Sequence, residues 1–501
     1  MLSHNSHCVV ITFPLQSHIN PALQFAKRLA RFGVKVTFLL AVSAHRRISN
    51  TSTNLLDTSP VTFLPFSDGY DDGMKSGDDG KKFMSEFKTR ATEALADLVR
   101  TSEEESRPVT CLVYTLLMSW AAEVATSSLG VPSAFLWIQP AMVFDLYYYY
   151  FNGYKDEIMK VVNNDVDAVE LPGLPCKLTC ADLPSFFVPS NAYSSTTLAM
   201  FEEQFEIFKS TTTTTTTTNS GPPKVFVNTF DELEPEALKA LHGSVELIAI
   251  GPFVPSAYLG GKDSSDTCFG GDMFESSQKC SEWLNTKAEN SVVYVSFGSI
   301  IVLKRRQVEE IARGLLDTGR PFLWVLRRAS PPSESNSPPD ADEEHVRSLI
   351  DEINNRGDEQ GLIVEWCSQV EVLSHNSIGC FVSHCGWNST LEGLVVGVPM
   401  VAFPQWTDQG TNAKLIEEAW GTGVRVKRSS VEVKKDGEDG KEEIVESEEV
   451  KRCVEVVMGE GERGEEIRKN VEKWRGLARK AVEDGGSERN LVAFLEEMGR
   501  D

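Results

Sequence analysis

The chain of 501 residues has little of what a secretory signal or a membrane-spanning helix requires. Its first stretch, MLSHNSHCVVITFP, has no basic segment, and Pro14 interrupts the apolar run, so we expect no signal peptide. No apolar stretch reaches the roughly 18 residues that a spanning helix needs. The ten cysteines include no CxxC pair, which argues against a zinc site and favours reduced, mostly buried thiols. Together these absences predict a cytoplasmic protein.

Positive charge is scarce in this sequence. The chain has 49 lysines and arginines against 73 aspartates and glutamates, which gives a net charge of −24. This balance argues against nucleic acid or an anionic membrane as the main partner. An anionic ligand would instead have to be held by local groups, such as the N-terminus of a helix.

Several familiar catalytic and metal-binding motifs are also missing. No P-loop, GxSxG or HExxH pattern occurs. Gly459, Gly461 and Gly464 match GxGxxG, but a helical pattern precedes them and acidic residues lie between them, so we do not expect dinucleotide binding. Asp165 and Asp167 form a DVD triplet with no third ligand nearby, which favours a solvated loop over a metal site.

The length of the chain and the order of its apolar segments predict two α/β domains. A chain of this size exceeds what one hydrophobic core supports. Residues 7–13, 20–32 and 34–42 follow the order strand, helix, strand, which is typical of a parallel sheet. The alternation continues to residue 252 and starts again at residue 278. We therefore expect two Rossmann-like domains facing a cleft, with ligands at the carboxyl ends of the strands.

Four segments interrupt this alternation. The Pro-bounded segment 253–277 is expected to link the two domains. The segment 211–222 contains eight consecutive threonines and is expected to form a mobile surface loop. Segments 330–344 and 429–449 are charged or rich in proline and serine, and we also expect them to be surface loops.

The segment Phe381–Gly393, FVSHCGWNSTLEG, places several polar groups directly after a buried strand. Ser389 followed by Glu392 predicts a capping box, and therefore a helix that starts at this point. A capped helix would explain the polar residues without any ligand. However, the N-terminus of a helix at the end of a parallel strand is a favourable anion site, because it carries about half a positive charge.

The residues around this segment extend the pattern. The run Trp366–Gln409, WCSQVEVLSHNSIGCFVSHCGWNSTLEGLVVGVPMVAFPQWTDQ, resembles the signature box of plant family 1 UDP-glycosyltransferases over all of its 44 positions. The resemblance continues from FPLQSHINPALQFAKRL to GGSERNL. It implies a GT-B fold with an acceptor-binding domain at 1–252, a UDP-sugar-binding domain at 278–480 and a C-terminal helix, 481–501, that returns to the N-terminal domain. It also implies a monomer.

The resemblance assigns roles to residues of the box and of the VSFGS turn before it. The uracil would stack on Trp366, a contact worth roughly 1–3 kcal/mol. The start of the helix would hold the diphosphate and stabilise its growing charge without a metal or another cofactor, so that UDP-glucose is a co-substrate. Gln409 is typical of members that use glucose. The implied contacts are Trp366, Gln369 and Glu392 for the nucleoside, Ser299, His384, Asn388 and Ser389 for the diphosphate, and Trp387, Asp408 and Gln409 for the sugar. Cys367 is a further implied contact of the UDP-sugar.

His18, in FPLQSHINP, is the general base that the resemblance implies. A neutral imidazole between the first strand and the first helix would take a proton from the acceptor as its oxygen attacks the anomeric carbon. Most members of the family pair this histidine with an aspartate, but Thr115 occupies that position here. A threonine cannot stabilise an imidazolium as a carboxylate does. Either another group compensates, or the acceptor ionises easily.

The segments YTLLMSWAAEVA and VFDLYYYYFNGY resemble a plant subgroup that includes anthocyanin 5-O-glucosyltransferases and enzymes that esterify auxin, abscisate or crocetin. We expect an inverting, UDP-glucose-dependent glucosyltransferase of small aglycones, with phenols of the flavonoid or anthocyanin type preferred. Gln139 and Met142 are candidate acceptor-pocket residues, and the tyrosines at 147–150 are expected to pack mainly in the core. The alternatives are a glucose-ester-forming enzyme for carboxylic acids, a transferase using another UDP-sugar, and a non-catalytic binding protein.

Overall fold

The computed structural model divides into two compact units. Unit 1 consists of Met1–Phe274 and Leu477–Asp501, and unit 2 of Glu275–Gly476. The threonine tract and most of the predicted loop at 330–344 lie outside the described residues. The described residues are 6–51, 59–75, 77–210, 222–260, 266–269, 278–327, 341–355, 360–435, 438–483 and 485–498.

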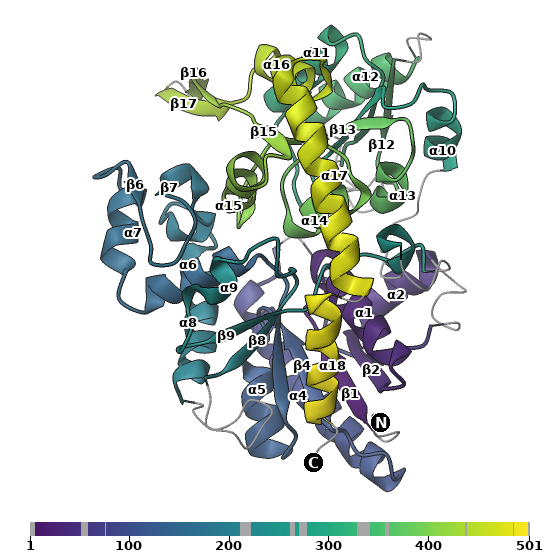
Figure 1. Ribbon diagram of the computed structural model, residues 1–501, viewed down its shortest axis with the longest axis vertical. Helices are drawn as coiled ribbons and strands as arrows, with labels where there is room; N and C mark the ends of the chain where they lie inside the picture. The colour runs from purple at the N-terminus through teal and green to yellow at the C-terminus, as the bar shows by residue number, and fades with distance from the viewer. Residues whose placement is uncertain are drawn as a thin grey trace. The chain divides into compact units, whose positions relative to one another are not determined.

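Among the described residues of unit 1, seven parallel strands form the central sheet, in the order β3-β2-β1-β4-β5-β8-β9 (Figure 1). The strands HCVVI and SAFLW are buried at every position, as expected for a parallel sheet covered on both faces. The strands are β1 (His7–Ile11), β2 (Lys35–Ala41), β3 (Thr62–Phe66), β4 (Cys111–Thr115), β5 (Ser133–Trp137), β8 (Lys224–Val227) and β9 (Glu246–Ala249). A short antiparallel pair, β6 (Ala168–Val169) and β7 (Leu178–Thr179), lies apart from this sheet.

The helices of unit 1 mostly follow the strands as predicted, with one shift that concerns the site. Helix α1 begins at Gln16, four residues before its predicted start, so His18 lies inside the helix and not in the loop before it. The helices are α1 (Gln16–Arg31), α2 (Val42–Thr51), α4 (Gly80–Glu104), α5 (Trp120–Glu123), α6 (Ala141–Phe151), α7 (Lys155–Val162), α8 (Ser194–Ser210), α9 (Ala237–Ala240) and α18 (Gly486–Met498).

The tyrosine run on α6 belongs mainly to the core, as predicted. Tyr147, Tyr149 and Tyr150 are buried. Tyr147 packs edge-on against Phe187 with ring centroids 5.3 Å apart, and Tyr150 stacks on the same phenylalanine at 4.6 Å. These contacts place aromatic surface between α6 and the segment before α8 and leave little of it for a ligand.

The C-terminal helix α18 packs within unit 1, which confirms the predicted return of the chain. Phe494 contacts Phe226 of β8, with ring centroids 4.6 Å apart, and Phe25 of α1 at 6.4 Å. Asn490 Nδ2 donates to the backbone oxygen of Ala249, in β9, at 2.8 Å. Helix α18 therefore covers apolar surface of strands and helices from the first half of the chain.

Unit 2 is built on six parallel strands, among its described residues, in the order β12-β11-β10-β13-β14-β15. The strands are β10 (Val292–Ser296), β11 (Phe322–Val325), β12 (Gly361–Val364), β13 (Ile378–Ser383), β14 (Met400–Ala402) and β15 (Gly423–Arg425). The helices are α10 (Gln278–Leu284), α11 (Arg305–Asp317), α12 (Ala341–Asn355), α13 (Gln369–Leu373), α14 (Trp387–Val396), α15 (Gln409–Lys414), α16 (Ser447–Met458) and α17 (Glu462–Glu483), the last of which continues past Gly476 into unit 1. The predicted α/β architecture with two parallel sheets is confirmed.

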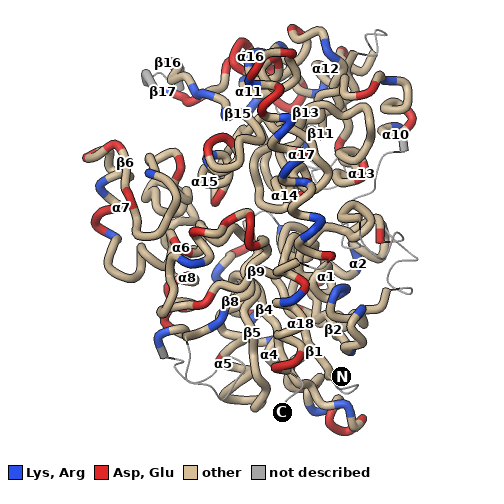
Figure 2. Tube along the Cα trace, in the orientation of Figure 1, with Lys and Arg blue, Asp and Glu red and all other residues tan. Residues whose placement is uncertain are grey.

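The segment 429–449 differs from its prediction. It forms an antiparallel hairpin of β16 (Ser429–Lys435) and β17 (Glu438–Ile444), which projects from unit 2 in Figure 1. The loop prediction was wrong because it weighed the charged side chains, whereas the ladder is formed by backbone groups. Acidic and basic residues are intermixed along both units (Figure 2). None of the described helices combines the length and apolar character that crossing a membrane requires.

Candidate active site

Strand β13 ends at Ser383, and helix α14 begins at Trp387. Gly386 is the N-cap of α14, and no side chain caps this helix. The predicted capping box was therefore wrong, because Ser389 already lies in the first helical turn. The first N–H groups of a helix point out of its N-terminal end, where they favour an anion. The expected anion-binding arrangement is thus present without the expected cap.

Ser389 and Glu392 are held by Gln369, the first residue of α13. Gln369 Nε2 donates to Ser389 Oγ and to Glu392 Oε2, each at 2.8 Å. Ser389 is 6% exposed and Glu392 4% exposed. These bonds fix a carboxylate and a hydroxyl next to the start of α14, which suits a ligand with hydroxyl groups beside an anionic group.

Tyr294, in the middle of β10, supports Gln369. Its hydroxyl donates to Gln369 Oε1 at 3.4 Å and lies 3.4 Å from Cys367 Sγ. Tyr294 is 1% exposed, and burial raises the pKa of its hydroxyl well above the ordinary value, so it stays a neutral donor. Sequence reasoning missed this residue because it occupies an ordinary buried position in a strand.

The ring of His384 is confined by two glycines. A Cβ atom would lie 2.6 Å from His384 Nε2 if placed on Gly298, and 2.5 Å if placed on Gly386. Gly298 also has a φ of +75°, which side chains rarely adopt. Burial lowers the pKa of His384 to about 4, so the ring is neutral at pH 7. Among the described residues its Nδ1 has no hydrogen-bond partner.

Asp408 and Gln409 lie where β14 leads into α15. Asp408 accepts from Asn412 Nδ2 at 2.7 Å, and burial raises the pKa of its carboxyl group above the ordinary value. Gln409 Oε1 accepts from the backbone N–H groups of Gln405 and Trp406, at 2.9 and 3.0 Å. Because its oxygen closes this turn, the amide nitrogen is the group that Gln409 can offer to a sugar.

The other predicted donor-site residues differ in what they can present. The indole of Trp387 is 4% exposed and packs against Trp420, with ring centroids 6.1 Å apart. Cys367 is 2% exposed. These two residues can therefore offer a ligand their backbone groups but little of their side chains. Partly exposed side chains are found at Ser299, Trp366 and Asn388.

In unit 1, His18 lies in the first turn of α1, with its ring centroid 5.7 Å from that of Phe13. Its Nδ1 is buried and has no partner among the described residues. Burial also lowers the pKa of His18 to about 4, so the ring is neutral at pH 7. Thr115, the last residue of β4, does not serve the histidine; its hydroxyl shares a 2.7 Å hydrogen bond with the hydroxyl of Thr12.

Comparison with known proteins identifies the family. A family model described as "UDP-glucoronosyl and UDP-glucosyl transferase" matches residues 267–456. Phloretin 4'-O-glucosyltransferase of Malus domestica is 52% identical over 98% of this chain and 97% of its own length. This chain belongs to the UDP-glycosyltransferase family.

Other members of the family agree with this assignment. Crocetin glucosyltransferase of Gardenia jasminoides, named as chloroplastic, is 51% identical over 99% of this chain and 98% of its own. Anthocyanidin 3-O-glucoside 5-O-glucosyltransferase of Verbena hybrida is 49% identical, over 98% and 99%. The crystal structure of Os79 from O. sativa in complex with UDP covers 98% of this chain and 100% of its own, at a TM-score of 0.77 and 31% identity. The predicted family, enzyme class and fold are confirmed.

This UDP-glycosyltransferase has an aromatic cluster beside His18 that sequence reasoning missed. Phe13 contacts Phe83 and Phe87 of α4, with ring centroids 6.0 and 6.1 Å apart. Phe87 in turn lies 6.5 Å from the ring of Trp120. The four-residue spacing of the two α4 phenylalanines marks one face of a helix and could have revealed them.

The two predicted acceptor-pocket residues of the UDP-glycosyltransferase behave differently. Met142 is 1% exposed, and its backbone N–H donates to Glu234 Oε1 at 3.0 Å. Its buried side chain therefore packs in the core at the start of α6, which begins at Ala141. Gln139 is partly exposed, and its Oε1 is buried with no partner among the described residues.

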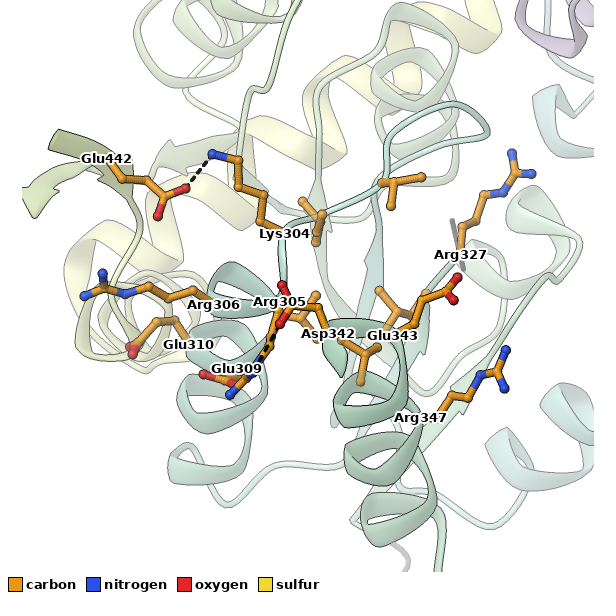
Figure 3. Close-up of a pocket in the computed structure, with 15 residues that line it drawn as sticks. Lys304, Arg305, Arg306, Glu309, Glu310, Arg327, Asp342, Glu343, Arg347 and Glu442 are labelled. Carbon is orange, nitrogen blue, oxygen red and sulfur yellow. Dashed lines mark hydrogen bonds and ion pairs between the residues drawn. The ribbon is translucent and has the colours of Figure 1, made fainter. Parts of the chain in front are cut away.

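A separate hollow of about 680 Å³ lies in unit 2 between the starts of α11 and α12 (Figure 3). Several of its acidic and basic groups pair with one another: Arg305 bonds to Glu309 at 2.8 Å and to Asp342 at 3.2 Å, and Lys304 bonds to Glu442. None of the predicted donor-site residues lines it. Within the described part of the chain, no group of three or more His, Cys, Asp or Glu side chains is placed to hold a metal ion.

Proposed function

We propose that this UDP-glycosyltransferase transfers glucose from UDP-glucose to a small phenolic aglycone of the flavonoid or anthocyanin type and forms a β-O-glucoside. The observation that carries the proposal is the bonded set of Gln369 from α13 with Ser389 and Glu392 from α14. A fixed carboxylate beside a helix N-terminus suits the ribose hydroxyls and the diphosphate of a nucleotide sugar. Relatives named for phloretin and for anthocyanidin glucosides support the acceptor class.

The donor would be held by unit 2. The uracil stacks on Trp366, and Glu392 accepts hydrogen bonds from the ribose with Gln369 beside it. The N–H groups at the start of α14 and the neutral ring of His384 stabilise the negative charge that grows on the diphosphate as the C1–O bond breaks. The remaining contacts are Ser299, Asn388 and Ser389 to the phosphates, the backbone of Cys367 to the nucleoside, and the backbone of Trp387 with Asp408 and Gln409 to the glucose.

The acceptor would be bound by unit 1, with Gln139 among the groups that contact it. The inward position of His18 Nδ1 leaves Nε2 to take the proton of the acceptor hydroxyl. The acceptor oxygen attacks C1 of glucose as UDP departs from the opposite side. A single displacement of this kind inverts the α-linked donor to a β-glucoside.

A glucose ester of a carboxylic acid is the second candidate product. The bond between Thr12 and Thr115 is compatible with it, because a carboxylate acceptor needs no base, but an easily ionised phenol is equally compatible with that bond. The crocetin enzyme, at 51% identity, also supports this class. Auxin and abscisate are further acids that the subgroup resemblance suggests.

The test is mass spectrometry of products formed from UDP-glucose with flavonoids, anthocyanins, hormone acids and crocetin, before and after mild alkali. A hexose adduct that survives alkali is a phenolic glucoside, and one that is lost is an ester. His18→Ala should abolish phenol glucosylation while calorimetric UDP binding is retained. Phenol turnover that survives this substitution would show that His18 is not the base.

Three further properties are part of the proposal. The anion-stabilising groups at the start of α14 and His384 make a resident metal unnecessary, so a chelator should leave the rate unchanged. The enzyme is expected to be a monomer, which light scattering at assay concentration would check. It is expected in the cytoplasm, which fractionation of plant tissue with a specific antibody would check.

A further inference from the structure

The buried Nδ1 side of the His18 ring determines how well this residue can act as a base. Its Nδ1 is buried and meets no hydrogen-bond partner among the described residues. At the end of β4, where the family resemblance implies a carboxylate, stands Thr115, whose Oγ1 is bonded to Thr12 Oγ1 at 2.7 Å. Both threonines are essentially unexposed, so water does not compete for that bond.

This geometry limits what His18 can do. When Nε2 accepts a proton, the ring becomes an imidazolium whose Nδ1–H also needs an acceptor. A buried charge without a hydrogen-bond partner is unfavourable. Burial alone accounts for the lowered pKa of His18, with no charged group opposing it. The neutral ring of His18 can therefore accept a proton, but few groups stabilise the imidazolium that forms.

We propose that this enzyme selects acceptors by the acidity of the attacking oxygen, and that its substrates are carboxylates and phenols conjugated to a carbonyl or cationic ring. The inference rests on the proposed glucosyl transfer. A carboxylate attacks C1 as the C1–O bond to UDP breaks, and no proton has to move. A conjugated phenol loses its proton to water or to His18 with little cost. Selection by acidity then applies to phenolic and carboxylic acceptors alike. It also predicts that the most acidic hydroxyl group of a polyphenol is glucosylated first.

The test begins with kcat/KM for a series of para-substituted phenols of graded acidity, with UDP-glucose at saturating concentration and one fixed pH. Below the acceptor pKa, the ionised fraction falls about tenfold for each unit by which that pKa rises. We expect kcat/KM to fall several-fold for each unit, after allowing for the greater nucleophilicity of less acidic phenols. A benzoate-type acid is measured beside them.

Two matched substitutions ask whether the missing carboxylate is the cause. Thr115→Asp places a carboxylate at the position where most members of the family carry one, and Thr115→Asn places a group of the same shape without the charge. Loss of the orienting charge costs about 10⁴ in rate in serine proteases. We therefore expect Thr115→Asp to raise kcat/KM at least tenfold for the least acidic phenol, to leave the benzoate rate unchanged, and to flatten the series. Thr115→Asn should neither raise kcat/KM for the least acidic phenol nor flatten the series.

The possible outcomes distinguish failure of the selection rule from failure of the proposed glucosyl transfer. A wild-type series that is flat, or equal profiles for the two Thr115 variants, overturns the selection rule while the transferase activity stands. Absence of transfer to every acceptor, with UDP still bound, overturns the proposed function itself. If Thr115→Asp does not fold, His18→Ala serves instead: the rule requires its loss of kcat/KM to be largest for the least acidic phenol and smallest for benzoate. An equal loss for all acceptors contradicts it.

Discussion

Substitution of Gly386 by alanine tests the placement of His384. The backbone of Gly386 has φ of −59° and ψ of 143°, which alanine adopts without strain. The added Cβ would nevertheless lie 2.5 Å from His384 Nε2 and 3.1 Å from its Cε1. On another side the ring meets Gly298, so it has little room to move. The methyl group must therefore displace the imidazole from its place beside the start of α14.

The size of the effect follows from the crowding. Forcing an extra methyl group into a packed site costs roughly 1–3 kcal/mol. If this cost falls on the conformation that binds the diphosphate, the Kd for UDP rises about 5- to 150-fold. Isothermal titration calorimetry with UDP measures it directly. Gly476→Ala is the matched control, because a Cβ there meets no atom within 4 Å, and its UDP affinity should equal that of the wild type.

A double-mutant cycle assigns the effect to the histidine. In a His384→Ala background the added methyl group has nothing to displace, so Gly386→Ala should cost nothing further. Unchanged UDP affinity in the single variant would refute the reasoning. So would an equal loss in both backgrounds, because the clash would then involve another group.

Two other predictions follow from the same domain. Tyr294→Phe removes the donor to Gln369 Oε1; at 3.4 Å the bond is long, so we expect a loss of about 1 kcal/mol, seen as a roughly fivefold rise in KM for UDP-glucose with kcat unchanged. A fall in kcat alone would contradict this positioning role. Because the pKa of His384 drops from 6.5 to about 4 on folding, its contribution to stability is complete above pH 6.5 and is lost as pH falls toward 4, by about 3 kcal/mol. Urea unfolding at pH 7 and pH 4.5 should therefore show a smaller loss for His384→Asn than for the wild type.

Much of the fold was predictable because buried parallel strands have uninterrupted apolar sequences. The strands β1, β10 and β13 are buried at nearly every position and stand out from their polar flanks. The donor site was equally accessible because one contiguous stretch, 366–409, runs from the end of β12 to the start of α15. Its resemblance to the signature box of the family, and not its residue types alone, indicated a site for a uracil, a ribose and a diphosphate.

The parts that sequence reasoning missed depend on contacts between distant residues. The hydroxyls of Thr12 and Thr115 are 103 positions apart and meet only because β1 and β4 pair in register. Gln369 lies 20 positions before Ser389, the residue predicted to cap α14, and donates a hydrogen bond to it. The hairpin at 429–444 is held by backbone groups under a charged sequence. Local patterns carry no record of such pairings.

The return of α18 to unit 1 matters for the order in which the protein is made. Unit 2 is one continuous stretch, so all of its residues leave the ribosome before α18 does. Until then Phe25, Phe226 and the backbone oxygen of Ala249 lack the partners that α18 supplies. The domain whose synthesis starts first is thus completed last. Removal of α18 would therefore destabilise the sheet of unit 1, which the first half of the chain forms.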